Sequence, residues 1–371
     1  SPDWGAVIGH CGHLNVHLMM RELGWWDGSP LLLTYADKIA NRPFLSLMKD
    51  RCPTWILEED VGFAIWHELA SLTPFVGEHQ TCKVPDGRSM NWNDAGAMAV
   101  AEWARQGRGF PVRDTYDKLA GSDDRISEQI VQLRKSWGMT PGDWYVCLHM
   151  RDAATRGNVE GTGESIRNTE WRNYLDSVEH ILSMGGWVVR MGGPKAPPLP
   201  PMDRVIDYAH AAEKSPEMDI RLVRNARMFI GTTSGFSYVA SSFGIPSAIV
   251  DAISSIGLLW TTQTRFTTKL VRSRTGRTLS LAELTSDRFR WSLANFETLA
   301  RAELMVKDNS PDEILEAVKE VLNLASAELP SLAEPSLPAW KAGFEIPDFF
   351  GAASPSKYFV DKHRDLLQCP G

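Results

Sequence analysis

The chain has 371 residues, of which 43% are hydrophobic and 23% are charged, and its formal net charge is −7. This length is enough for two domains with separate cores, and the composition is that of a soluble globular protein. The acidic balance argues against a nucleic-acid binder, which would carry a basic face, so nucleic acid is not an expected partner.

The cysteines and the apolar runs bear on where the protein works. The five cysteines include no Cys-x-x-Cys pair, which argues against a disulfide framework or a zinc ribbon and favours a reducing, cytoplasmic location. No run approaches the ~18 apolar residues that a membrane-spanning helix needs. Because the chain begins Ser-Pro-Asp without Met, we keep open that a preceding segment holds an anchor for peripheral membrane association.

The first part of the chain, residues 1–140, alternates short apolar runs with helical stretches. Residues 4–8 are predicted to form a strand, followed by a Gly-His loop at 9–15 and a helix from about Val16. The later elements predicted in this part are strands at 31–35 and 54–57 and helices at 43–49, 91–106 and 123–137. Strand, helix and strand in this order are typical of a parallel sheet.

The second part, residues 141–325, alternates more regularly. Its predicted strands cover residues 144–150, 187–191, 204–207, 228–230 and 247–250. Its predicted helices cover residues 169–184, 218–226, 235–240 and 311–324. The alternation predicts a doubly wound α/β domain. Residues 326–371 are rich in proline, and we expect them to form a tail that packs back on the first domain.

The segment at 227–250 contains a pattern typical of a phosphate cradle. A predicted strand stops at Gly231, and the turn and helix start that follow are Thr232, Thr233, Ser234, Gly235 and Phe236. Amide groups at a helix N-terminus, together with hydroxyl donors, favour a bound anion. The alternative is that these hydroxyls only cap the helix.

Other polar residues follow the predicted strands or lie in a basic stretch of the second part. They are His149, Arg151, Arg167, Asn168, Arg190, Gly192, Asp207, Tyr208 and Lys269. Guanidinium groups match the geometry of phosphate oxygens, and the carboxyl ends of parallel strands meet at one edge of a sheet. We therefore expect this set to bind one anionic ligand together with the cradle. Each cation taken singly also fits a surface ion pair.

The first part offers histidines as candidate bases. Gly9 and Gly12 flank His10, and His13 follows, so a ligand could approach the backbone closely beside a side chain that accepts protons near neutral pH. His13 or His10 is the predicted base, and the alternative is a histidine that only bonds the loop backbone. The chain has no Gly-x-x-x-x-Gly-Lys-Ser/Thr and no Asp-x-Asp, so neither a cofactor nor a metal is expected.

These motifs together resemble the GT-B glycosyltransferases. The most specific matches are to an uncharacterised bacterial glycosyltransferase family found with cell-surface polysaccharide genes, whose second domain is similar to those of fucosyltransferases and heptosyltransferases. The matching segments are His149-Met-Arg151-Asp152, Arg167-Asn168, Val189-Arg190-Met191-Gly192 and residues 229–246. The resemblance implies a GT-B-like fold, in which two Rossmann-like domains face each other across a cleft.

The resemblance also implies a reaction. A sugar would pass from a nucleotide-sugar donor to a glycan, lipid-linked or protein acceptor, without a metal and with inversion. A base on the first domain would deprotonate the acceptor, while Arg151, Arg190 and the cradle stabilise the departing diphosphate. Two alternatives remain open at this point: a nucleotide-sugar epimerase or hydrolase of the same fold, and a non-catalytic protein that binds glycans or nucleotides.

Overall fold

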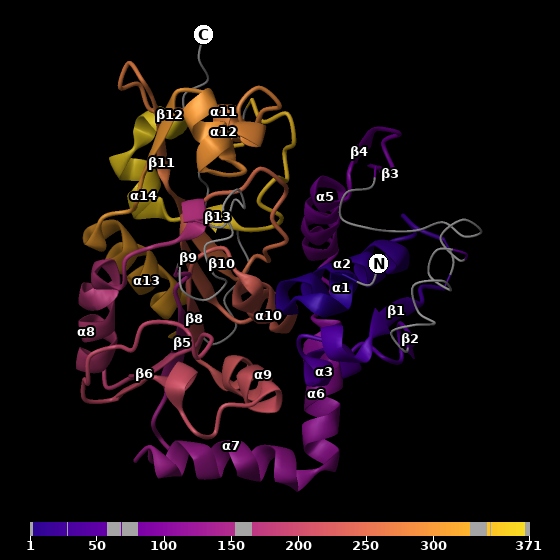
Figure 1. The fold of residues 1–371 in the computed structure, drawn as a ribbon, viewed down its shortest axis with the longest axis vertical. Helices are drawn as coiled ribbons and strands as arrows, with labels where there is room; N and C mark the ends of the chain where they lie inside the picture. The colour runs from indigo at the N-terminus through magenta and orange to yellow at the C-terminus, as the bar shows by residue number, and fades with distance from the viewer. Residues whose placement is uncertain are drawn as a thin grey trace.

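A computed structural model describes the chain in two α/β parts that lie side by side (Figure 1). The residues that it describes are 3–27, 29–57, 68, 81–152, 165–326, 340–341 and 343–367. The second part contains a seven-stranded parallel sheet, and the first part contains a two-stranded parallel sheet and a hairpin. The large parallel sheet confirms the predicted α/β class.

The order of strands in the large sheet reverses near its centre. In space, its strands follow the order β13 (Ser354–Pro355), β10 (Thr264–Thr268), β9 (Ser247–Ala252), β8 (Met228–Gly231), β5 (Tyr145–His149), β6 (Trp187–Arg190) and β7 (Val205–Ile206). From β5 the chain builds outward through β6 to β7, then returns to β8 on the other side of β5. The reversal therefore lies between β5 and β8.

Helices cover both faces of this sheet, which explains why its central strands are almost wholly apolar. Val146 and Leu148 of β5 pack on one face with α8 (Leu175–Ser183) and α13 (Pro311–Ser326). Cys147 points to the other face, towards α9 (Pro216–Asn225) and α10 (Gly235–Phe243). A capping box begins α13, since the amide of Ser310 donates to the side chain of Glu313 and the amide of Glu313 donates to the hydroxyl of Ser310.

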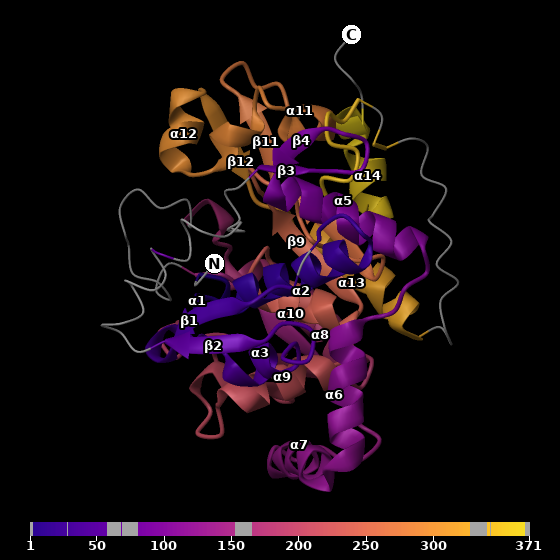
Figure 2. The same ribbon diagram turned by 90° about the vertical axis from the view of Figure 1, so that its right-hand side faces the viewer.

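The end of the chain contacts both parts. Ser354–Pro355 of β13 pairs with β10 at the edge of the large sheet, and α14 (Lys357–Lys362) packs beside α13. Asp348 accepts hydrogen bonds from Arg105 of the first part at 3.2 and 3.3 Å. The chain between β10 and α13 forms a smaller lobe at the top of Figure 2. It consists of β11 (Leu270–Ser273), α11 (Leu281–Thr285), α12 (Phe296–Arg301) and β12 (Leu304–Lys307).

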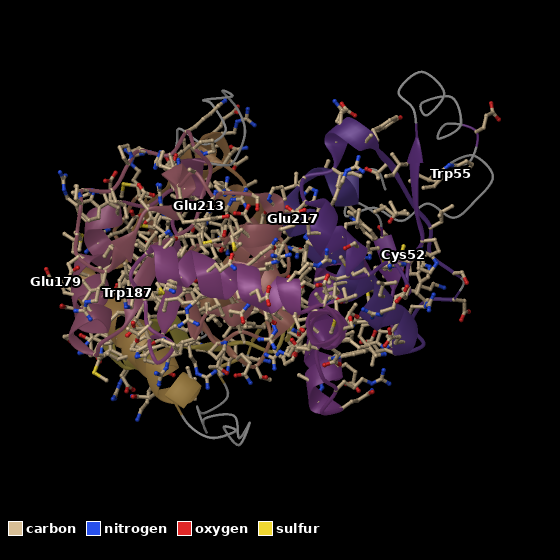
Figure 3. The ribbon with its side chains drawn as sticks, turned by 90° about the horizontal axis from the view of Figure 1, so that it is seen from below. Cys52, Trp55, Glu179, Trp187, Glu213 and Glu217 are labelled. Atoms are coloured by element: carbon tan, nitrogen blue, oxygen red, sulfur yellow. The ribbon has the colours of Figure 1, made fainter. Side chains whose placement is uncertain are left out.

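The first part is mostly helical, and Figure 2 shows it facing the viewer. Its elements are α1 (Asp3–Ala6), α2 (Ile8–Glu22), β1 (Leu32–Tyr35), α3 (Arg42–Ser46), β2 (Thr54–Leu57), β3 (Thr81–Lys83), β4 (Ser89–Asn91), α5 (Trp92–Arg105), α6 (Pro111–Ser122) and α7 (Asp124–Ser136). The first part also contains the single-turn helix η1 (Ala36–Lys38). The other single-turn helices are η2 (Ser165–Arg167), η3 (Trp171–Tyr174), η4 (Tyr208–His210) and η5 (Arg290–Leu293) in the second part and η6 (Arg364–Leu367) in the tail. Trp55 of β2 lies at the outer edge (Figure 3).

The predicted strand at 4–8 and loop at 9–15 are wrong, because these residues lie in α1 and α2. An apolar run of five residues fits a buried helix as well as a strand. The glycines of the supposed loop lie inside α2, where they allow it to approach α10. A Cβ atom on Gly9 would lie 3.0 Å from the Cα of Gly235, and one on Gly12 would lie 2.9 Å from the Cβ of Tyr238.

Buried polar contacts also join the two parts. Arg290 donates to Asp94 of α5 at 2.7 Å, and both side chains are buried. Arg113 of α6 donates to the backbone carbonyls of Phe243 and Gly244 at the end of α10. These bonds fix the relative position of the parts, because breaking one would leave a buried charge without its partner. Among the helices described, none has the length and apolar character needed to cross a membrane.

Candidate functional site

A cleft opens where the strand order of the large sheet reverses, at the carboxyl ends of β5 and β8. Open α/β sheets bind their ligands at this kind of position, because the loops from the two strands diverge there. The empty space of the cleft, with the solvent at its open mouth included, measures about 1050 Å³. Val7, Ile8 and Asn41 belong to its wall on the first part. From the second part come six residues predicted from the sequence, namely His149, Arg151, Gly192, Ser234, Gly235 and Phe236.

Two helices begin at this cleft. Gly9 of α2 lies against Gly235 of α10, and Gly12 lies against Tyr238, so the two helices run in the same direction with their starts adjacent. Ile8 and Gly235, the first residues of these helices, both line the cleft. Each helix N-terminus carries partial positive charge and amide groups that the helix itself does not bond. Two such termini at one cleft favour an anionic ligand.

The hydroxyls of the predicted cradle have different roles. Ser234 caps α10 through a reciprocal capping box with Ser237, so the alternative of helix capping is correct for this residue. The capping box bonds the backbone amides of Ser234 and Ser237. The first two amides of the helix itself, those of Gly235 and Phe236, are not bonded by the box. Thr232 and Thr233 are buried behind the cap, and their hydroxyls have no hydrogen-bond partner among the residues described.

His149 ends β5 and forms part of the cleft wall. Its ring lies 5.1 Å from that of Phe236, and its Nδ1 has no hydrogen-bond partner in the described part of the chain. Burial lowers its pKa to about 3, and the charges of Arg151, Arg190 and Lys214 add to this effect. The imidazole is therefore neutral near neutral pH, so it can exchange hydrogen bonds with a ligand but adds no positive charge.

Lys214 and Asp219 line the cleft, and the sequence analysis missed both. The Nζ of Lys214 donates to Asp219 at 2.7 Å, at the start of α9. Burial is the main cause of the raised pKa of Asp219. Ser215 caps α9 just after β7, and this Ser-Pro start was the signal that could have placed Lys214 at the sheet edge. Figure 3 shows the neighbouring Glu217 at the junction of the two parts.

Three residues predicted to bind the donor pair with other groups and do not line the cleft. Arg190 is buried, and it donates to Asp207 at 2.9 Å and to the carbonyl of Pro197 at 3.2 Å. Burial raises the pKa of Asp207, but hydrogen bonds from Leu199, His210 and Arg190 outweigh this and hold it below its usual value. Tyr208 is fully buried, and its hydroxyl bonds the backbone of Ser215.

The remaining predicted donor residues lie beside the cleft. Lys269 is 3% exposed, and its Nζ donates to the backbone carbonyl of Asn168 at 2.7 Å and to Asp308 at 2.6 Å. Arg167 ends η2, next to Asn168, and neither residue lines the cleft. Residues 153–164 of the polar loop that leads to them lie outside the described residues.

The two histidines proposed as bases lie on α2, outside the cleft lining. His13 is 4% exposed, its ring stacks on that of His10 at 5.1 Å, and it lies 5.4 Å from Trp92 and 5.6 Å from Tyr238. The sequence analysis placed these histidines in a glycine-rich loop, whereas both lie in a helix, and the assignment of the base stays a prediction. Within the described ranges, no group of three His, Cys, Asp or Glu residues is placed to hold a metal ion.

Among the solved structures similar to this chain are a family 9 glycosyl transferase and two heptosyltransferases. A family 9 glycosyl transferase from Veillonella parvula DSM 2008 is 11% identical, with 85% of this chain and 80% of that chain covered and a TM-score of 0.37. The E. coli ADP-heptose lps heptosyltransferase II is 12% identical, with 87% of this chain and 98% of that chain covered and a TM-score of 0.44. The iron-containing heptosyltransferase TibC is 16% identical, with 51% of this chain and 47% of that chain covered and a TM-score of 0.26. No family model and no curated protein matches this chain. We therefore base the function on the residues of the cleft.

Proposed function

We propose that this protein is a glycosyltransferase that binds the diphosphate of a nucleotide-sugar donor in the cleft at the carboxyl ends of β5 and β8. The observation that carries the proposal is the convergence of anion-binding groups in one cleft. The starts of α2 and α10, the guanidinium of Arg151 and the ammonium of Lys214 all line it, beside the carboxylates of Asp152 and Asp219. A diphosphate is the anion that these groups fit, because it offers several oxygens to fixed donors.

The proposed reaction is a direct displacement that needs no metal. The acceptor oxygen attacks the anomeric carbon, the bond from that carbon to the diphosphate oxygen breaks, and the electron pair leaves with the diphosphate. Arg151, Lys214 and the helix amides stabilise the negative charge that develops on the leaving group. A single attack from the opposite side inverts the anomeric centre.

The proton of the acceptor hydroxyl needs a base, and we assign this role to Asp152. This carboxylate lines the cleft directly after Arg151, whereas His10 and His13 do not line it. Ala6, Ala40 and Asn41 line the cleft from the first part beside the start of α2, and we propose them as the acceptor surface. The side-chain amide of Asn41 already bonds Phe44 and Pro216, so backbone groups would meet the glycan hydroxyl, whether the glycan is free, lipid-linked or attached to protein.

A binding experiment tests the donor site. UDP, GDP, ADP, CDP and dTDP are titrated by calorimetry into the protein and into its Arg151→Gln variant. Removing a charge-assisted pair of hydrogen bonds should weaken the best of these ligands by roughly 10- to 100-fold. Arg125→Gln is the matched control, because Arg125 is exposed on α7 and pairs with Asp123. If no nucleoside diphosphate binds, or if Arg151→Gln binds equally well, the proposal is wrong.

A turnover experiment separates the proposed reaction from its alternatives. Each nucleotide sugar that binds is incubated with and without glycan acceptors, and the products are assigned by NMR. Transfer with inversion, lost in Asp152→Asn while donor binding persists, supports the proposal. A new sugar isomer, or a full equivalent of free sugar without an acceptor, would instead show an epimerase or a hydrolase. Retention at the anomeric centre would contradict the displacement.

A further inference from the structure

The loop between β5 and η3 has its two ends tied together. The backbone amide of Thr169 donates to the backbone carbonyl of Arg151 at 3.2 Å. This bond connects the residue that enters the loop with the one that leaves it. Arg151 lines the cleft, so the position of its backbone depends on what holds Thr169.

The side chain of Thr169 is held by a buried carboxylate. Its Oγ1 donates to Oδ2 of Asp251 at 2.7 Å, at the carboxyl end of β9. Asp251 is 1% exposed and does not line the cleft. Its backbone φ of 52° lies in the left-handed region, which costs free energy for a residue with a Cβ atom.

Asn309 explains how this strained residue persists. The amide of Asp251 donates to Oδ1 of Asn309 at 2.7 Å, and the amide of Asn309 donates to Oδ1 of Asp251 at 2.6 Å. Asn309 also donates to the carbonyl of Thr268 at 2.9 Å. These bonds anchor Asp251 to β10, a strand of the large sheet, and to the start of α13, a helix that packs on that sheet.

A buried cation holds the neighbouring residue of the same loop. Lys269 donates to the carbonyl of Asn168 at 2.7 Å and pairs with Asp308 at 2.6 Å. Burial raises the pKa of Asp251 to about 6, and the charge of Lys269 opposes this rise. Burying charged groups costs several kcal/mol for each ion. Asp251 bonds Thr169 and Lys269 bonds Asn168, so the two buried charges hold the two residues at which the loop ends.

We propose that Asp251 and Lys269 are positioning residues that hold Arg151 at the mouth of the cleft through Thr169 and Asn168. We call Asp251, Lys269, Thr169 and Asn168 the clasp. Lys269 then acts on the loop and not on a phosphate of the donor. The clasp rests on the proposed function only for the identity of the anion that Arg151 meets.

The test compares two substitutions at one position. Thr169→Val removes the hydroxyl but keeps the shape, and Thr169→Ser restores the hydroxyl. Hydrogen exchange of the peptides that contain Arg151 and residue 169 should become at least about tenfold faster in Thr169→Val and return in Thr169→Ser. Thr115→Val, which removes a hydroxyl bonded to the carbonyl of Pro111 in α6, should leave these peptides unchanged.

The same variants give a second readout through ligand binding. At a temperature where all are folded, Thr169→Val should weaken the best nucleoside diphosphate about tenfold, whereas Thr169→Ser and Thr115→Val should bind as the parent protein does. Unchanged exchange in Thr169→Val, or unchanged affinity despite faster exchange, overturns the clasp. If the parent protein binds no nucleoside diphosphate, the proposed function fails, and the exchange measurement still decides whether the loop is held in this way.

Discussion

Gly235 allows a close approach between the two parts of the molecule at the start of α2, and replacing it by alanine tests how the cleft is assembled. An added Cβ atom would lie 2.6 Å from Cγ2 of Ile8, 3.0 Å from the backbone nitrogen of Gly9 and 3.5 Å from its Cα. The methyl group of Ile8 can rotate away. The backbone of Gly9 cannot, so α2 must move relative to α10.

The expected magnitude is the balance of two effects. Alanine at the first position of a helix gains at most about 1 kcal/mol over glycine. Forcing a methyl group into a closely packed contact costs about 1–3 kcal/mol, and a backbone neighbour places this case at the upper end. We therefore expect a net loss of about 1–2 kcal/mol, together with weaker nucleotide binding, because the starts of α2 and α10 would separate.

The assay is urea unfolding followed by tryptophan fluorescence, with calorimetric titration of the best nucleoside diphosphate. Gly121→Ala is the matched control, since Gly121 lies in α6 and a Cβ atom there would meet no atom within 4 Å. This control should be neutral or stabilised by up to about 1 kcal/mol. If Gly235→Ala proves as stable as Gly121→Ala and binds nucleotide normally, the close packing of the two helix starts does not shape the cleft.

Three further predictions concern single side chains. Lys214→Met should weaken nucleoside diphosphate binding about tenfold in calorimetry, while Lys195→Met on the exposed loop should not, and equal affinities would remove Lys214 from the site. Arg190→Met should lower the unfolding free energy by about 3 kcal/mol because it breaks a buried pair with Asp207, yet leave nucleotide affinity within twofold; a large loss of affinity in folded protein would return Arg190 to the donor site. His149 has a folded pKa of about 3, below its usual 6.5, so the stability that its neutral form gives is present above pH 6.5 and is lost as the pH falls towards 3. Relative to His149→Gln, the parent protein should therefore lose up to about 1.4 kcal/mol per pH unit in urea titrations below pH 6.5, and parallel pH curves would refute this.

Between residues 144 and 250 the elements of the second part could be predicted from the sequence, whereas β10, β11, α11, α12 and β12 were not predicted. Its strands are buried on both faces, so each is a short apolar run bounded by turn residues, and its helices carry clear stop and start signals. The segments predicted at 187–191 and 228–230 match β6 and β8 closely. Because parallel strands end at one edge, the sequence also placed His149, Arg151 and the cradle correctly on the same side of the sheet.

The side-chain pairings at that edge could not be predicted in the same way. Arg190 and Lys269 looked like free cations, but each has an acidic partner that comes from another loop. Lys214 looked like an ordinary loop residue, yet it pairs with Asp219 and both residues line the cleft. Which cation is buried against a carboxylate and which lies at the cleft depends on loop geometry, and no local pattern in the sequence encodes that geometry.

By itself, the sequence determined the α/β class, the order of elements from β5 to β9 and the sheet edge at which the cleft lies. Only the tertiary structure decided that residues 8–22 form a helix. Gly9 and Gly12 have low helix propensity and suggested a loop, yet the closeness of α10 requires residues without side chains there. Packing between distant segments overrode local preference, because burying two helix faces against each other stabilises the fold by more than two glycines cost.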